Sequence, residues 1–161
     1  MASCSQSYVK NIDSFIAEFN NISDTELLKT DFSLKHDENE VHSFCLVDSD
    51  ILLSVKSDSK SMNIRSISIT SEKLSSKFKS ISSSVISAVS GFDKEKADEL
   101  VNAIIKGKEK EYANEMHTLD LISIFYTRTK VGSTLTVTYN EEVPTETTFV
   151  PETATEYITN S

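Results

Sequence analysis

The chain has 161 residues and a formal net charge of -9, with 38% hydrophobic and 25% charged residues. This length and composition favour one folded domain with its own hydrophobic core. The basic residues are dispersed among acids, so the chain should repel a phosphate backbone, and we expect no nucleic-acid partner. With only three glycines, a glycine-rich phosphate loop is also disfavoured.

The first predicted element is a helix. Apolar residues at Tyr8, Ile12, Phe15, Ile16 and Phe19 recur every three or four positions, which is the spacing of one helix face. This pattern predicts a helix over residues 6–20. Serines at positions 5 and 7 are its candidate N-caps.

Between residues 31 and 70 the apolar period changes to two, which predicts four short strands. Turn-forming residues separate these strands at 37–39, 48–50 and 57–59, so the strands should pair antiparallel as a meander. The apolar parity shifts within the fourth strand, which predicts a bulge near Arg65 and Ser66.

Helical spacing returns over 71–90 and again over 93–106. Thr70 or Ser71 is the candidate N-cap of the first helix, Gly91 ends it, and Asp93 begins the second. The first helix carries an unusual number of serines opposite its apolar stripe. Such a face either packs closely against a neighbour or faces solvent, and we favour the solvated face.

Two strands are predicted near the C-terminus. Residues 119–126 are apolar on both alternations, which predicts a central strand covered on both faces. Leu135, Val137 and Tyr139 alternate with threonines, which is typical of a strand with one buried face. The predicted fold is therefore α+β: an antiparallel sheet of about six strands, with an N-terminal helix and a central two-helix corner packed on it.

The domain is expected to span residues 1–142. Residues 143–161 are rich in Thr and Glu and contain no Lys or Arg. We predict that this tail is disordered.

The densest polar cluster is formed by His36, Asp37, Glu40 and His42, around a predicted hairpin turn. Imidazole and carboxylate groups can ligate zinc-type ions. However, the cluster lacks an established ligand spacing, and acidic residues are common in exposed turns. We therefore favour a solvated polar turn and predict neither a metal site nor a cofactor.

No catalytic signature is present. Ser and Asp are so abundant that a Ser-His-Asp trio carries no information, and the G-x-S-x-G elbow is missing. Cys45 and His42 lie three residues apart on a predicted strand, so they should face opposite sides. A disulfide between Cys4 and Cys45 is an alternative to a buried free Cys45, which we favour. We therefore predict a protein that is not an enzyme.

The N-terminal residues give the one indication of location. Ala2-Ser3-Cys4 resembles the end of a bacterial lipoprotein signal, in which small residues precede the lipidated cysteine. The resemblance implies lipidation of Cys4, membrane attachment, and a position outside the bacterial cytoplasm.

Two functions of different kinds follow from these observations. The first is a non-enzymatic binding domain of a surface lipoprotein, which contacts an unknown protein or small ligand through its sheet or sheet edge. The alternative is a cytosolic acidic inhibitor or immunity-type protein that binds a basic partner.

Overall fold

One antiparallel sheet of seven strands, in the order β1-β2-β3-β4-β7-β6-β5, organises the protein. The computed structural model describes residues 11–108 and 112–140. In chain order the elements are α1 (Ile12–Ile22), a short 3-10 turn (Lys29–Asp31), β1 (Ser33–His36), β2 (Glu40–Asp48), β3 (Ile51–Asp58), β4 (Ile64–Ser71), α2 (Ser76–Ser90), α3 (Lys94–Ile105), β5 (Ala113–Thr118), β6 (Ile122–Thr129) and β7 (Gly132–Tyr139). The predicted α+β class is confirmed. The sheet has seven strands rather than six.

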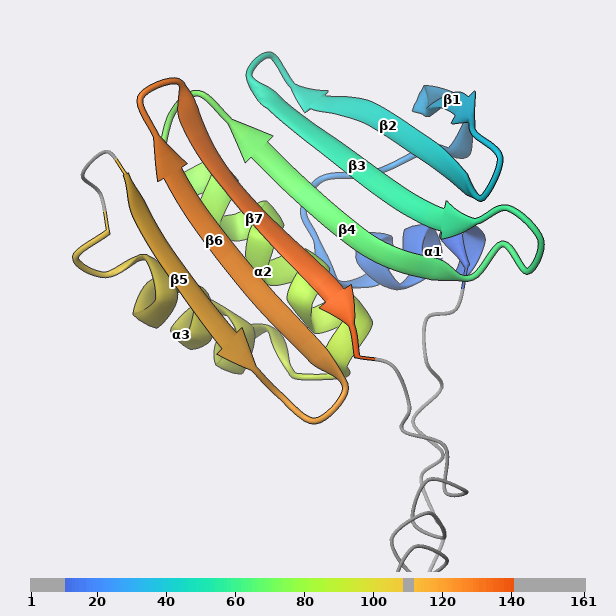
Figure 1. Cartoon of the computed structure of the whole chain (residues 1–161). Helices are drawn as coiled ribbons and strands as arrows, with labels where there is room; N and C mark the ends of the chain where they lie inside the picture. The colour runs from blue at the N-terminus through green and yellow to red at the C-terminus, as the bar shows by residue number, and fades with distance from the viewer. Residues whose placement is uncertain (1–10, 109–111, 141–161) are drawn as a thin grey trace, which may run out of the picture.

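All three helices lie on the same face of the sheet, as Figure 1 shows. α2 contacts α1, α3 and strand β4, so it occupies the centre of the helix layer. The core lies between this layer and the alternate residues of the strands, such as Leu53, Ile69 and Leu135, which are fully buried. None of the described helices has the length and apolar character needed to span a bilayer.

The additional strand is β5, at one edge of the sheet. Its sequence, Ala113–Thr118, has no apolar alternation, because Glu115 and His117 on its helix-facing side are polar. Glu115 lies opposite Tyr126 in the register and forms ion pairs with Lys108 and His117, at 3.3 Å in each case. The alternation of apolar and polar residues that predicts the other strands is therefore missing here.

Helix boundaries differ from the prediction where a better local cap is present. α1 begins at Ile12, because the side chain of Asn11 accepts a hydrogen bond from the Ser14 N–H. α2 begins after Ser75, because β4 continues to Ser71 before the chain can turn. The ends predicted at Gly91 and Asp93 are confirmed: Gly91 adopts a left-handed conformation, and Asp93 caps α3.

The predicted bulge in the fourth strand is confirmed. Lys56 pairs with Ser66 and Ser57 pairs with Ile64, so Arg65 is the extra residue. The prediction that residues 119–126 form a central strand covered on both faces is wrong. Leu119–Leu121 form the turn before β6, and Phe125 on the outer face of β6 is 46% exposed.

The expectation of a solvated serine face on α2 is also wrong for the second half of the helix, although Ser76 at its start is exposed. Its buried serines are Ser82, Ser83, Ser84, Ser87 and Ser90. Because α2 has helices on two sides and the sheet on a third, only small side chains fit there. Several of the hydroxyls donate to backbone carbonyls of their own helix, as Ser84 does to Ser80 at 3.0 Å.

Enlarging a buried serine should therefore destabilise the fold. We expect Ser84→Leu to lower the free energy of unfolding by ~1–3 kcal/mol, because the added carbons meet a packed neighbour. Urea denaturation measures the change. Ser80→Leu, on the exposed part of the same helix, is the matched control and should change stability far less. Equal effects at the two positions would contradict the packing of α2.

The predicted tail, residues 143–161, lies outside the described residues, as does Cys4.

Candidate functional site

The sheet face opposite the helices is the most extensive surface without a covering element in the described part of the chain (Figure 1). In antiparallel pairs, directly opposed residues project from the same face. The strand registers therefore identify which side chains share this outer face.

We call this surface the open face and define it by three transverse rows of opposed residues. The rows are Ser33, Phe44, Ser54, Ser68, Thr136, Phe125 and Met116; Leu46, Leu52, Thr70, Thr134, Thr127 and Asn114; and Lys35, His42, Lys56, Ser66, Thr138, Ser123 and Thr118.

Most members of the open face are Ser or Thr, and none is Asp or Glu. At its centre, hydroxyls of neighbouring strands bond to each other: Ser68 Oγ lies 2.9 Å from Thr136 Oγ1, and Thr70 Oγ1 lies 3.1 Å from Thr134 Oγ1. An acidic chain thus has three consecutive rows without an acidic side chain, and the next register pair on the same face, Glu40 opposite Asp58, ends this stretch. Hydroxyl groups can donate and accept hydrogen bonds to a partner without the cost of desolvating a charge.

Exposed apolar side chains flank the hydroxyl centre on both sides. On β2 and β3, Leu46 and Leu52 lie directly opposite each other beside Phe44, and Leu46 is 66% exposed. On β5 and β6, Met116 lies opposite Phe125 and is 67% exposed. These side chains give the open face two patches from which water can be excluded on binding.

The predicted polar cluster is divided by the sheet. His42 projects from the open face in register with Lys35, whereas His36 is opposite Val41 and projects toward the helix side. Asp37 accepts a hydrogen bond from the Glu38 N–H within the turn, at 2.7 Å. Within the described ranges, no three His, Cys, Asp or Glu residues converge as metal ligands. The hairpin therefore does not bring the two histidines together.

Glu40 and His42 instead belong to a different group at the end of the open face. Glu40 Oε2 lies 3.2 Å from His42 Nε2, and Glu40 Oε1 lies 3.8 Å from an Arg65 nitrogen. Arg65 also pairs with Asp58. The N–H of Ser61, together with the Arg65 guanidinium and the Lys60 N–H, holds the pKa of the Asp58 carboxyl well below its usual range. These bonds account for Asp58 as part of the β3–β4 turn and for Glu40, at the start of β2, as a partner of His42 and Arg65.

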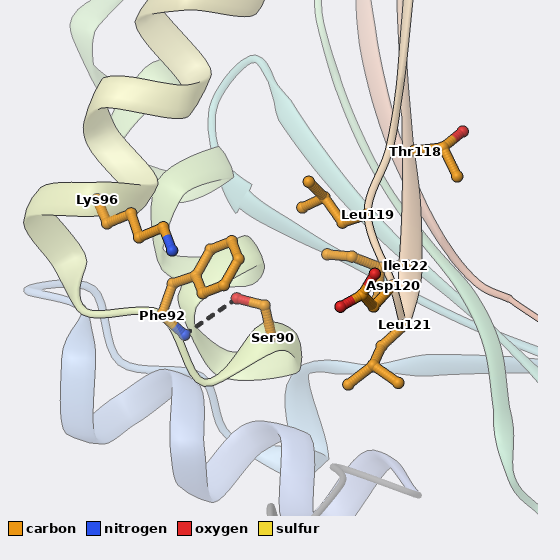
Figure 2. A pocket seen from close by; sticks show the side chains of 8 residues that line it. All are labelled: Ser90, Phe92, Lys96, Thr118, Leu119, Asp120, Leu121 and Ile122. Carbon is orange, nitrogen blue, oxygen red and sulfur yellow. Dashed lines mark hydrogen bonds between the residues drawn. The ribbon is translucent and has the colours of Figure 1, made fainter.

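A pocket of about 380 Å³ lies beside the corner between α2 and α3. Its other wall is the turn between β5 and β6, as the side chains in Figure 2 illustrate. Its lining residues are Ser90, Phe92, Lys96, Thr118, Leu119, Asp120, Leu121 and Ile122. The lining combines apolar side chains with one cationic and one anionic group.

Hydrogen bonds fix both walls of this pocket. Ser90 Oγ accepts from the Phe92 N–H at 3.1 Å (Figure 2), and the Phe92 carbonyl accepts from Ser87 Oγ at 2.5 Å. On the strand side, the Asn140 amide donates to the Leu119 carbonyl at 2.7 Å. The Leu119 N–H donates to the Ile122 carbonyl at 2.8 Å. The pocket is therefore shaped by secondary-structure junctions that are already bonded.

The comparisons with known proteins add no relative. No protein-family model, no curated protein and no solved structure matches the chain.

The sequence predicted contact through the sheet or its edge, but it did not identify the side chains of the open face, and it gave no sign of the pocket. The Thr134, Thr136 and Thr138 alternation did indicate a polar strand face, but the continuation of that face over Ser54 and Ser68 depends on strand order. The pocket joins residues 90–96 to residues 118–122, and no local motif signals that contact.

Cys45 is a buried free thiol that projects away from His42, as the sequence predicted. Burial, with a smaller effect of the Asp31 carboxylate, raises its pKa to about 11. In a Cys4→Ser background, we expect iodoacetamide to modify the native protein slowly at neutral pH and the urea-unfolded protein rapidly. Mass spectrometry follows the reaction. Rapid modification of the folded protein would contradict the buried, protonated thiol.

The same shift predicts a pH dependence of stability. The unfolded thiol ionises near its ordinary pKa of 9.0 and the folded thiol near about 11. The free energy of unfolding should therefore fall as the pH rises between these values. In Cys45→Ala, the free energy of unfolding should fall less over this pH range than in the wild-type protein. Urea denaturation at several pH values measures the difference.

Proposed function

We propose that the protein is a non-enzymatic binding domain whose contact surface is the open face. The observation that carries the proposal is the absence of Asp and Glu from three rows of exposed side chains on a chain of net charge -9. The proposal assigns no catalytic role to any residue.

The chemistry of the open face favours another protein with an uncharged surface as the partner. Interface centres are depleted in charged residues and enriched in aromatic residues and Met, and here Phe44, Phe125 and Met116 flank bonded hydroxyls. Seven strands spaced about 4.8 Å apart, with about six residues along each strand, give an area of roughly 600 Å². This is near the ~800 Å² that each partner buries in a standard interface.

The alternative, an acidic inhibitor that masks a basic partner, requires a surface dominated by carboxylates. The formal charges within the three rows are those of Lys35 and Lys56. The open face is thus unsuited to a basic partner, and the alternative would need another surface. Salt separates the two functions: binding through the open face should change little with ionic strength, whereas binding of a basic partner should weaken strongly.

Crosslinking in the source cell tests the proposed contact surface. A photo-reactive phenylalanine analogue replacing Phe125, in the open face, should yield a discrete protein adduct. The same analogue replacing Lys77, on the exposed side of α2, should not yield that adduct. Mass spectrometry of the adduct identifies the partner.

A blocking substitution then separates specific binding from incidental proximity. We expect Thr136→Glu to weaken binding of the identified partner about tenfold or more, because a carboxylate at the centre of the contact would be buried without a partner. Lys77→Glu should leave the affinity unchanged. Crosslinking from position 77 alone, or full affinity in Thr136→Glu, would refute the open face as the contact surface.

Membrane attachment through Cys4 is the second part of the proposal, supported by the resemblance of Ala2-Ser3-Cys4 to a bacterial lipoprotein signal. We expect the protein from its own host to be in the membrane fraction, with Cys4 carrying several acyl chains, because one chain anchors only marginally. Intact mass measurement and fractionation check this, with Cys4→Ser as the control. An unmodified Cys4 in the soluble fraction would exclude lipidation and favour the cytosolic alternative.

A further inference from the structure

The pocket between the α2–α3 corner and the β5–β6 turn has the features of a second binding site. It touches the open face only at Thr118. Its chemistry is also different, because it pairs two opposite charges with an apolar lining. The inference therefore does not depend on the function proposed above.

The apolar part of the pocket comes from both walls. Phe92 contributes its ring from the helix corner, and Leu119 and Leu121 contribute aliphatic side chains from the strand turn (Figure 2). These three residues also pack partly against the hydrophobic core. Since the surrounding backbone is hydrogen-bonded at both walls, a ligand would meet a preformed site.

The cationic group of the pocket is Lys96. Its ammonium nitrogen lies 3.9 Å from the centroid of the Phe92 ring, an arrangement that holds the cation over the aromatic face. Lys94, two residues earlier, instead forms an ion pair with Asp98 at 2.9 Å. Among the described residues, Lys96 has no carboxylate partner, so its charge is available to an anionic group of a ligand.

The anionic group is Asp120, on the opposite wall. Its backbone carbonyl accepts from the Asn140 amide at 3.4 Å, but its carboxylate has no ion-pair or hydrogen-bond partner among the described residues. Figure 2 places the Asp120 carboxylate on the strand side and the Lys96 ammonium on the helix side of the Phe92 ring. The pocket thus presents separated charges of opposite sign, each without an ion partner.

We propose that this pocket binds a free α-amino acid with an aliphatic side chain. The α-carboxylate pairs with Lys96, the α-ammonium pairs with Asp120, and the side chain contacts Phe92 and the two leucines. A simple anion would be repelled by Asp120, and a simple cation would be repelled by Lys96. An uncharged ligand would partly desolvate both charges without replacing their hydration. A volume of about 380 Å³ suits a small ligand of this class.

Binding of L-leucine to the full-length protein, followed by two-dimensional amide NMR, tests the proposal. Saturable shifts are expected at residues 90–96 and 118–122. Both charged groups of the pocket are solvent-exposed, so the dissociation constant should be on the order of 1 mM. Leucinamide, which lacks the carboxylate, and 4-methylpentanoate, which lacks the ammonium, should each bind about fivefold or more weakly. Glycine should also bind more weakly, because it lacks the aliphatic contact.

Substitutions of Lys96 and Asp120 test which charged group of the ligand each residue binds. Lys96→Met should remove the preference for leucine over leucinamide, and Asp120→Asn should remove the preference for leucine over 4-methylpentanoate. Lys94→Met, which removes a neighbouring cation outside the pocket, is the matched control and should retain both preferences. Unshifted amide signals elsewhere in the spectrum report that each variant is folded.

Two results would overturn the proposal. One is the absence of saturable shifts with leucine at concentrations well above the expected dissociation constant. The other is equal binding of leucine, leucinamide and 4-methylpentanoate, which would identify a merely apolar pocket. Either result leaves the crosslinking and affinity measurements on the open face unaffected, so the two proposals fail separately.

Discussion

The burial of α2 is the constraint on which the rest of this structure depends. α2 contacts α1, α3 and strand β4, and almost every residue of its second half is buried, serines included. Small side chains at these positions let neighbouring elements approach, and their hydroxyls bond to backbone carbonyls, so buried polar atoms find partners. The hydroxyl of Ser82 is an exception, since it is buried without a hydrogen-bond partner.

A helix layer centred on α2 covers one face of the sheet and leaves the other open. The alternation along each strand then sorts the side chains: Leu135 and Val137 enter the core, while Thr134, Thr136 and Thr138 face outward. The other six strands alternate in the same way, so their outward-facing side chains form rows of hydroxyl groups with apolar side chains on both sides. An outer face that served only for solubility would be expected to carry mixed charges. Three adjacent rows of this face lack acids, which are present only from the next register pair, Glu40 and Asp58, onward, and this acid-free stretch is the strongest argument for a partner.

The two proposed sites arise from different features of the fold. The open face is an extended surface made by strand pairing, and it suits a large partner with few charges. The pocket is made where the α2–α3 corner meets the β5–β6 turn, and it suits a small zwitterion because Lys96 and Asp120 lie on opposite walls. Thr118 belongs to both, so a ligand in the pocket would lie at the border of the protein contact surface.

The sequence by itself determined the elements whose signals are local. The apolar spacing of α2 and α3, the Gly91 and Asp93 boundaries, the meander of β1 to β4 and the bulge at Arg65 all follow from periodicity and turn chemistry within a few residues. The orientation of Cys45 away from His42 also follows, because three residues along a strand reverse the side-chain direction.

Only the tertiary structure decided which of these faces meet each other. The serines of α2 are buried because helices lie on both sides of it, and β5 is a strand because β6 supplies its hydrogen-bond partner despite its polar sequence. His36 and His42 separate because the β1–β2 register places them on opposite faces. Strand order joined the hydroxyl rows, and a junction between distant segments made the pocket. Such contacts depend on long-range packing, which local propensity and periodicity do not encode.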